Sequence, residues 1–313
     1  MQEEKQIIKH FDPLATLNKQ LTIPNNTELD KIDFIHTKSL RLKPNDLFIS
    51  DLKWKYLIRT LLYGKNILIE GPSGSGKTRS ILSLKTVFPE RPFFNISMGN
   101  STDPKSTLIG NTHFKQDTGT FFNRSLFVQA IQTKNAIILL DELSRAHPEA
   151  GNILMPVLDS EQRFLRLDDE VDSPTIPVAT GVCFLATANI GVEYTSTRIM
   201  DRSLMDRFIR IVMEPLSREE ESQLIQLKYP ALNIDTVNAI SEIVDITRQE
   251  VKKPDSKLST IISTRASLEI AGLCNDRFSL EEAFQVQVYP FYSEIGDNES
   301  ERCFIKQILQ KFI

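Results

Sequence analysis

Cysteine, histidine and long apolar runs are all scarce in this chain of 313 residues. The three cysteines are too far apart for a C-x-x-C metal clip, so free thiols are expected. The four histidines lack the spacing of a metal site. These residues are Cys183, Cys274, Cys303, His10, His36, His113 and His147. Their number and spacing argue against a transition metal held by the protein.

The chain has no uninterrupted apolar run of about 18 residues, which argues against a membrane-spanning helix. Residues 1–5 are rich in charge and are not followed by an apolar stretch as long as that of a secretion signal. The formal net charge of −4 argues weakly against non-specific binding to nucleic acid. We therefore expect a cytoplasmic protein without a membrane partner, long enough for two domains.

Glycine is also sparse, with 12 residues, yet three of them fall within residues 71–78. This stretch reads G-x-x-x-x-G-K-T between an apolar run and a helix-compatible segment, and a chance match is less plausible in that context. In a phosphate cradle of this kind, backbone N–H groups converge on phosphate oxygens, Lys77 reaches the β and γ phosphates, and the Thr78 hydroxyl sits on Mg²⁺. The expected nucleotide-binding residues are Gly71, Pro72, Ser73, Gly74, Ser75, Gly76, Lys77, Thr78 and Arg79.

Acidic and polar residues end two further apolar runs. Asp141 and Glu142 follow residues 136–140, which are apolar on both faces as a central parallel strand requires. Asp141 is expected to hold Mg²⁺, and Glu142 to orient or deprotonate the water that attacks the γ-phosphate. A strand entering a solvated turn would look the same, but the cradle favours catalysis. Asn189 ends the next strand, where it either contacts the water or phosphate or caps a turn.

Strands alternate with helices through the first two thirds of the chain, which predicts a doubly wound parallel sheet with its ligand at the carboxyl ends of the strands. The expected strands are 66–70, 92–98, 136–140, 182–189 and 208–213, preceded by a helix from residue 51 to 63. Residues 99–125 are expected to form a loop or hairpin insertion without other regular structure. After residue 217 only helices are expected, at 218–227, 234–251, 265–273, 280–288 and 300–312, and Ser279 with Glu282 forms a capping box.

Three segments follow from this pattern. Residues 1–44 form an N-terminal arm that packs on another part, with a disordered leader as the alternative. Residues 45–216 form the α/β nucleotide-binding core. Residues 217–313 form a C-terminal helical domain.

Four motifs together, at residues 71–78, 139–146, 186–189 and 203–208, resemble those of MoxR-like AAA+ ATPases, the chaperone-like branch related to midasin. The resemblance covers residues 50–275. It implies an α/β P-loop AAA+ core with a five-stranded parallel sheet and two hairpin insertions, plus a C-terminal all-α lid. Suitable places for the hairpins are residues 110–123 and 163–178. One departure is that residues 189–193 lack the proline that is frequent after the sensor in MoxR sequences.

The resemblance also assigns roles. Residues 71–78 correspond to Walker A, Asp141 and Glu142 to Walker B, and Asn189 to the first sensor. Arg207 resembles the arginine that such enzymes present to the nucleotide of a neighbouring subunit. Arg202 is a second candidate for that role, and a local salt bridge is the structural alternative for Arg207. Arg265 resembles the second sensor, with a cap or an ion pair on the lid surface as the alternative.

The implied activity is ATP hydrolysis with Mg²⁺ in a homo-oligomeric ring, expected to be a hexamer, that remodels a protein client such as a von Willebrand A-domain protein. The expected catalytic residues are Glu142, Lys77, Asn189, Arg207 and Arg265, with Arg145 expected at the subunit interface. The hairpin residues Phe114, Phe121 and Phe122 either grip the client or pack in the core.

Two other functions remain open from the sequence. One is a nucleic-acid-associated motor of the restriction type, with GTP as its nucleotide, which the chain's acidic charge disfavours. The other is a nucleotide-gated scaffold with little hydrolysis, against which the intact Glu142 and Arg207 argue.

Overall fold

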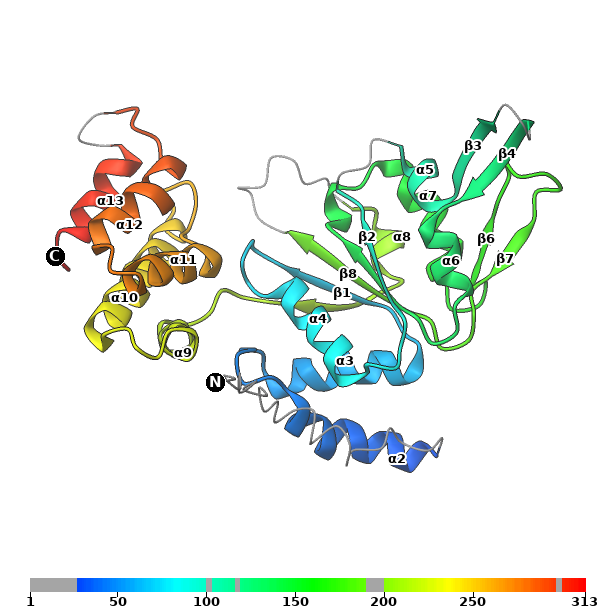
Figure 1. Cartoon of the computed structure of the whole chain (residues 1–313), viewed down its shortest axis with the longest axis horizontal. Coiled ribbons are helices and arrows are strands. Elements are labelled where there is room, and N and C mark those ends of the chain that lie inside the picture. The colour runs from blue at the N-terminus through cyan, green and yellow to red at the C-terminus, as the bar shows by residue number, and fades with distance from the viewer. Residues whose placement is uncertain (1–26, 100–102, 116–118, 190–199, 297–299) are drawn as a thin grey trace, which may run out of the picture.

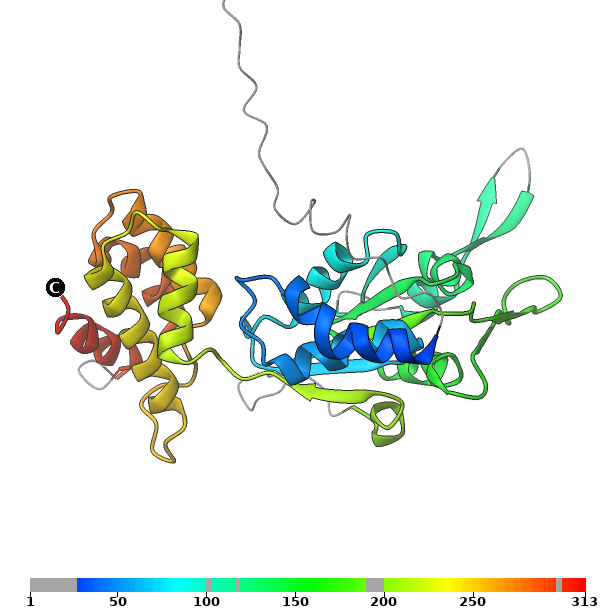
Figure 2. The same ribbon diagram turned by 90° about the horizontal axis from the view of Figure 1, so that it is seen from below.

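The computed structural model describes residues 27–99, 103–115, 119–189, 200–296 and 300–313. The described chain forms an α/β core followed by a helical lid, and residues 213–217 join the two as a single extended stretch (Figures 1 and 2). The change from strands to helices therefore occurs close to the predicted one at residue 217.

The core is built on five parallel strands in the order β2-β5-β8-β1-β9. Their bounds are β1 Ile67–Gly71, β2 Phe93–Ser97, β5 Ile137–Asp141, β8 Cys183–Asn189 and β9 Ile209–Val212. The three central strands are buried on both faces, which is why they read as continuous apolar runs in the sequence. Gly71 lies opposite Asn189, and Ser97 opposite Asp141, so the carboxyl ends of these strands meet at one edge. The predicted sheet is confirmed.

Helices cover both faces of the sheet. One face packs on α3 (Asp51–Tyr63) and α4 (Lys77–Val87), whose apolar side chains join the core around Trp54. The other packs on α5, α6 and α7, around Phe127 and Phe184. The bounds on that face are α5 Pro104–Leu108, α6 Leu126–Gln132, α7 Pro148–Leu158 and α8 Arg202–Met205. The prediction that residues 99–125 hold no helix was wrong, because α5 buries Leu108 against this core.

The described part of the N-terminal arm packs on the core. It consists of α2 (Glu28–Asp33), a π-helical turn (Phe34–Lys38) and a 3₁₀ turn (Ser39–Leu42). Phe34 is buried beside Phe88, and the Trp54 indole N–H donates to the Ser39 carbonyl at 2.8 Å. The rest of the arm, residues 1–26, lies outside the described residues, so the alternative of a disordered leader is not tested there.

Two antiparallel hairpins leave the core at the end remote from the lid, as Figure 1 shows. The first joins β3 (Gly110–Lys115) to β4 (Gly119–Arg124), and the second joins β6 (Phe164–Arg166) to β7 (Thr175–Pro177). Both occupy the segments in which the sequence predicts hairpin insertions.

The lid has a core of its own, centred on Val244, Ile270 and Phe284. Its helices are α9 Arg218–Lys228, α10 Ile234–Val251, α11 Thr264–Asn275, α12 Leu280–Gln287 and α13 Glu301–Leu309, with a 3₁₀ turn at Tyr289–Phe291. Ser279 and Glu282 form the predicted capping box at the start of α12. Among the residues that the structure describes, no helix is both long and apolar enough to cross a lipid bilayer.

Candidate functional site

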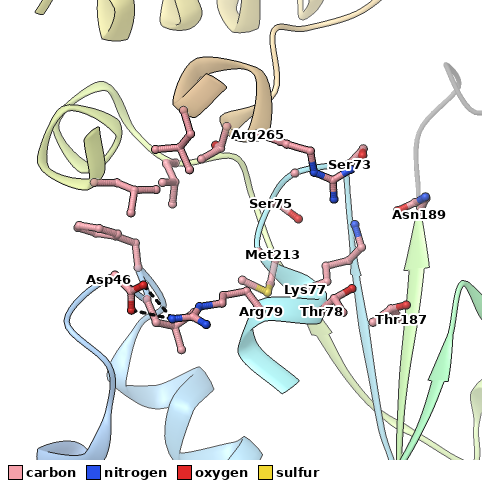
Figure 3. Close-up of a pocket in the computed structure, with 18 of the residues that line it drawn as sticks. Asp46, Ser73, Ser75, Lys77, Thr78, Arg79, Thr187, Asn189, Met213 and Arg265 are labelled. Carbon is pink, nitrogen blue, oxygen red and sulfur yellow. Dashed lines mark hydrogen bonds and ion pairs between the residues drawn. The ribbon is translucent and has the colours of Figure 1, made fainter. Parts of the chain in front are cut away.

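A cavity of about 430 Å³ lies where the carboxyl edge of the sheet faces the lid. The loop after β1, the ends of β5 and β8, and the start of α11 all line it. Figure 3 shows Lys77, Thr78 and Asn189 along the sheet side, while Arg265 reaches from α11 toward the loop beside Ser73. The structure thus brings together the residues that the sequence predicts for nucleotide binding.

The glycine-rich loop owes its path to close backbone approaches. A Cβ atom on Gly71 would lie 2.2 Å from the Met213 carbonyl oxygen, so no side chain fits there. Gly76 has φ of 86° and is the N-cap of α4, and it brings no side chain to the N–H groups of the first turn. These N–H groups and the positive end of the helix dipole form an anion-binding site.

Lys77 folds back over this loop. Its ammonium donates to the carbonyl oxygens of Gly71 and Pro72 at 2.9 and 2.6 Å. Burial lowers the pKa of Lys77 from 10.5 to about 8, an effect that the charge of Asp141 opposes and that of Arg265 reinforces. An arriving anion would therefore find the ammonium held next to the N-terminus of α4.

Asp141 ends β5 beside two hydroxyl groups. Its Oδ1 accepts a hydrogen bond from Thr187 at 2.5 Å and lies 3.4 Å from the hydroxyl of Thr78. Carboxylate and hydroxyl oxygens suit Mg²⁺, which typically takes few protein ligands and completes its shell with water and phosphate oxygens. The residues present therefore fit a magnesium ion held by Thr78 and Asp141.

Glu142 adopts a left-handed backbone conformation, with φ of 57°. Such a conformation is strained for a residue other than glycine and is common at functional sites. The Glu142 N–H donates to the Thr187 hydroxyl at 2.9 Å, and Arg145 pairs with the carboxylate at 3.2 Å. A Cβ on Gly99 would lie 2.3 Å from Glu142 Oε2, so glycine at that position leaves room for the carboxylate.

Asn189 lies at the end of β8, and its side chain lines the cavity. Its backbone N–H donates to the hydroxyl of Ser144 at 3.1 Å, which ties the end of β8 to the segment after Glu142. The alternative of a turn cap before Gly191 concerns residues outside the described part of the chain, as does the proline-lacking stretch 190–193.

Arg79 and Arg265 both line the cavity but differ in their contacts. The Arg79 guanidinium pairs with Asp46 at 2.8 Å (Figure 3). Lys228 of the lid lies 3.4 Å from the same carboxylate. Arg265 lies in the first turn of α11, whose N-cap is Ser263, and its charge acts on Lys77. Arg79 is thus bound by the chain itself, whereas Arg265 faces the loop.

Arg207 lies at the opposite edge of the sheet. It precedes β9, whose first residue pairs with Ile67 at the start of β1. Its guanidinium contacts Asp159 at 3.3 Å and the carbonyl oxygens of Met155 and Ser203 at 3.1 and 2.6 Å. The local ion pair that the sequence left as an alternative is therefore present. The exposed side chain of Arg202 takes part in no hydrogen bond or ion pair within the described residues, while its backbone carbonyl accepts from the Asp206 N–H at 2.9 Å.

Comparison with known proteins identifies the family. Residues 66–208 match the AAA domain of the dynein-related subfamily. The putative chaperone BssE of Thauera aromatica is 31% identical over 219 residues, which cover 70% of this chain and 72% of that protein. The chain belongs to the dynein-related AAA family. Its predicted resemblance to MoxR-like AAA+ ATPases is confirmed, and so is the predicted fold.

Two further relatives extend the comparison of this AAA protein. Midasin of Dictyostelium discoideum is 30% identical over 190 residues, which are 58% of this chain but only 3% of that much longer protein. The uncharacterized protein YojN of Bacillus subtilis is 26% identical over 261 residues, covering 81% of this chain and 80% of that protein. The family is one of nucleotide-binding ATPases, and this membership agrees with the cavity at the carboxyl edge of the sheet.

Sequence reasoning missed several residues of this AAA site. Thr187 contacts both Asp141 and Glu142, and it precedes Asn189 by two positions, so the two share a face of β8. This two-residue spacing in a strand was the sequence signal that could have identified Thr187 as a residue of the site. The contacts of Gly99 and Asp46 join segments far apart in the sequence, and no local pattern reveals them.

Proposed function

We propose that this chain is an ATP-hydrolysing AAA+ ATPase that works as a ring and remodels a protein partner. The observation that carries the proposal is the meeting of Lys77, Asp141 and Glu142 in one cavity that Arg265 closes from the lid. Phosphoryl transfer asks a protein mainly for positioning and charge neutralisation, and these groups supply both.

Each residue has a distinct task in the proposed reaction. Lys77 and Arg265 balance the charge of the phosphates, while Glu142 orients the attacking water and Asn189 donates to the water or the γ-phosphate. A magnesium ion held by Thr78 and Asp141 would neutralise charge on the phosphate oxygens. Glu142 directly follows β5 and lines the cavity, next to the proposed magnesium ligand Asp141.

A second copy of the chain completes the site in this proposal. Arg207 lies at the amino-terminal edge of the sheet, away from the cavity of its own chain, and Arg202 begins the short helix α8 just before it in the sequence. An arginine at that edge contacts a nucleotide only if a neighbouring copy brings one there. This arrangement supports a ring, for which we propose six subunits on the basis of the MoxR-like family.

The proposed client contacts are on the hairpins. Phe114 is 76% exposed and Phe121 is 44% exposed, and both lie on the β3–β4 hairpin that projects from the core (Figure 2). Exposed aromatic side chains on a projecting element favour contact with another protein. The name of the relative BssE, a putative chaperone, also supports a protein client. A von Willebrand A-domain protein is the client class that the family resemblance suggests.

The substitution Glu142→Gln tests this proposal. We expect ATP turnover to fall by about 10²-fold or more while ATP binding persists, because the amide keeps the shape but removes the base. Glu149→Gln, an exposed carboxylate in the first turn of α7, is the matched control and should leave turnover unchanged.

The same assay separates the alternatives. Faster turnover of GTP than ATP, together with stimulation by DNA, would favour a nucleic-acid motor. A wild-type chain that binds ATP without hydrolysing it would point to a scaffold. Unchanged hydrolysis in Glu142→Gln would refute the proposed role of that carboxylate.

A further inference from the structure

A fully buried ion pair lies in the lid next to the nucleotide cavity. Glu221 of α9 and Arg248 of α10 are joined at 2.8 Å, and their side chains are 0% and 5% exposed. Burying two charges is costly, and apolar residues of similar size often stabilise a core equally well. Stability alone is therefore a weak reason for this pair.

The pair extends to the first turn of α11. The Thr264 hydroxyl donates to Glu221 at 3.0 Å and accepts from Arg248 at 3.1 Å, and the Ser267 hydroxyl also donates to Glu221. Thr264 is the first residue of α11 and immediately precedes Arg265. Two hydroxyl groups of α11 thus link the buried charges to the helix that carries the proposed second sensor, and that of Thr264 also accepts from Arg248.

The pair also reaches the connection between core and lid. Arg248 donates to the Leu216 carbonyl oxygen at 2.7 Å, and both Leu216 and Thr264 line the cavity. On the other side, a Cβ on Gly74 would lie 2.9 Å from Cβ of Ser263, so the N-cap of α11 packs closely on the glycine-rich loop. The cluster therefore contacts both the start of α11, next to Arg265, and the stretch that joins the core to the lid.

We propose that Glu221, Arg248 and Thr264 are positioning residues that hold Arg265 and the connecting stretch in place for the nucleotide. The inference rests on the proposed function, because it gives these residues a role at the same site. If the cluster only stabilised the lid, substitutions in it would affect folding, and their effect would not depend on whether Arg265 is present.

Two substitutions at Thr264 test the inference. Thr264→Val removes the hydroxyl and keeps the shape, whereas Thr264→Ser keeps the hydroxyl. We expect kcat/KM for ATP to fall about tenfold in Thr264→Val and to stay within about twofold in Thr264→Ser. Ser241→Ala is the control, because this buried hydroxyl of α10 bonds, within the part of the chain that the structure describes, only to the Val237 carbonyl oxygen of its own helix.

The decisive measurement repeats Thr264→Val in an Arg265→Ala background. If the cluster acts through Arg265, the second substitution has little further effect on kcat/KM. An equal, independent tenfold loss in both backgrounds would overturn the inference. ATP dissociation constants are measured for the same variants. If the wild-type chain binds ATP without hydrolysing it, the proposed function is refuted. The coupling between Thr264 and Arg265 is then tested on the dissociation constants instead of kcat/KM.

Discussion

At the scale of single residues, the candidate site holds Glu142 in a strained backbone conformation and Lys77 in a buried position. The left-handed backbone of Glu142 costs about 1–3 kcal/mol, and its hydrogen bond to Thr187 and ion pair with Arg145 help to maintain it. Lys77 is buried against loop carbonyl oxygens with a lowered pKa. Both observations indicate a site arranged before its ligand arrives.

The lowered pKa of Lys77 predicts proton uptake on ATP binding. Near its pKa of about 8, the ammonium is half deprotonated in the free chain. Phosphate charges favour the protonated form, so binding raises this pKa and should take up about half a proton at that pH, and less at pH 6. Calorimetry in buffers of different ionisation enthalpy measures this uptake.

The control for this prediction is Lys77→Met, which should remove the pH-dependent uptake along with much of the affinity. Affinity of the wild-type chain should also decline as the pH rises above 8, because the neutral amine must first be protonated. Proton uptake that is the same at pH 6 and pH 8 would contradict the assignment to Lys77.

At the scale of elements, an ion pair joins the two hairpins. Arg124 at the end of β4 contacts both carboxylate oxygens of Glu170, which lies in the turn between β6 and β7. Both side chains are partly exposed, so the pair contributes at most about 1 kcal/mol. Its bidentate geometry nevertheless adds a directional contact between the two hairpins.

Glu170→Gln should therefore loosen the hairpins without unfolding the core. We expect amide hydrogen exchange in β3 and β4 to accelerate by up to about fivefold, the equivalent of the lost pair. Asp168→Asn is the matched control, because its pair with Arg166 lies within the second hairpin and is more exposed. Equal exchange in wild type and Glu170→Gln would show that the pair does not couple the hairpins.

Sequence patterns predicted the elements well where local signals agreed. The helix 234–251 matches α10 at both ends, and the apolar runs became the five strands. Helix α7 was not predicted, because Pro148, Gly151 and Pro156 disguise its pattern, and packing of Leu154 and Val157 against the core decides its structure.

The site was predictable in its motifs but less so in its supporting contacts. The phosphate loop, Asp141 and Glu142 follow recognisable strand ends, and the structure brings them together. The pairing of Glu221 with Arg248 and of Asp46 with Arg79 depends on how distant segments pack, which no spacing in the sequence records.

At the scale of the whole molecule, the cavity and the candidate arginine Arg207 lie at opposite edges of one sheet. Strand β1 spans the distance between the two edges. Its first residue, Ile67, pairs with β9 just after Arg207, and its last residue, Gly71, lies about 13 Å away at the cavity. A chain of this shape presents a nucleotide site at one edge and an arginine at the other. The central claim of the proposed function is that two copies meet through these edges to complete each site.

Mixing two inactive variants tests that claim most directly. One carries Lys77→Ala and keeps both arginines, and the other carries Arg202→Ala with Arg207→Ala and keeps the phosphate loop. Each alone should lose about 10³-fold or more of its ATP turnover. Complexes that contain both variants, purified through two different tags, should regain measurable turnover, because the first supplies arginines to the intact site of the second. Mixed complexes as inactive as either variant alone would contradict a site shared between copies.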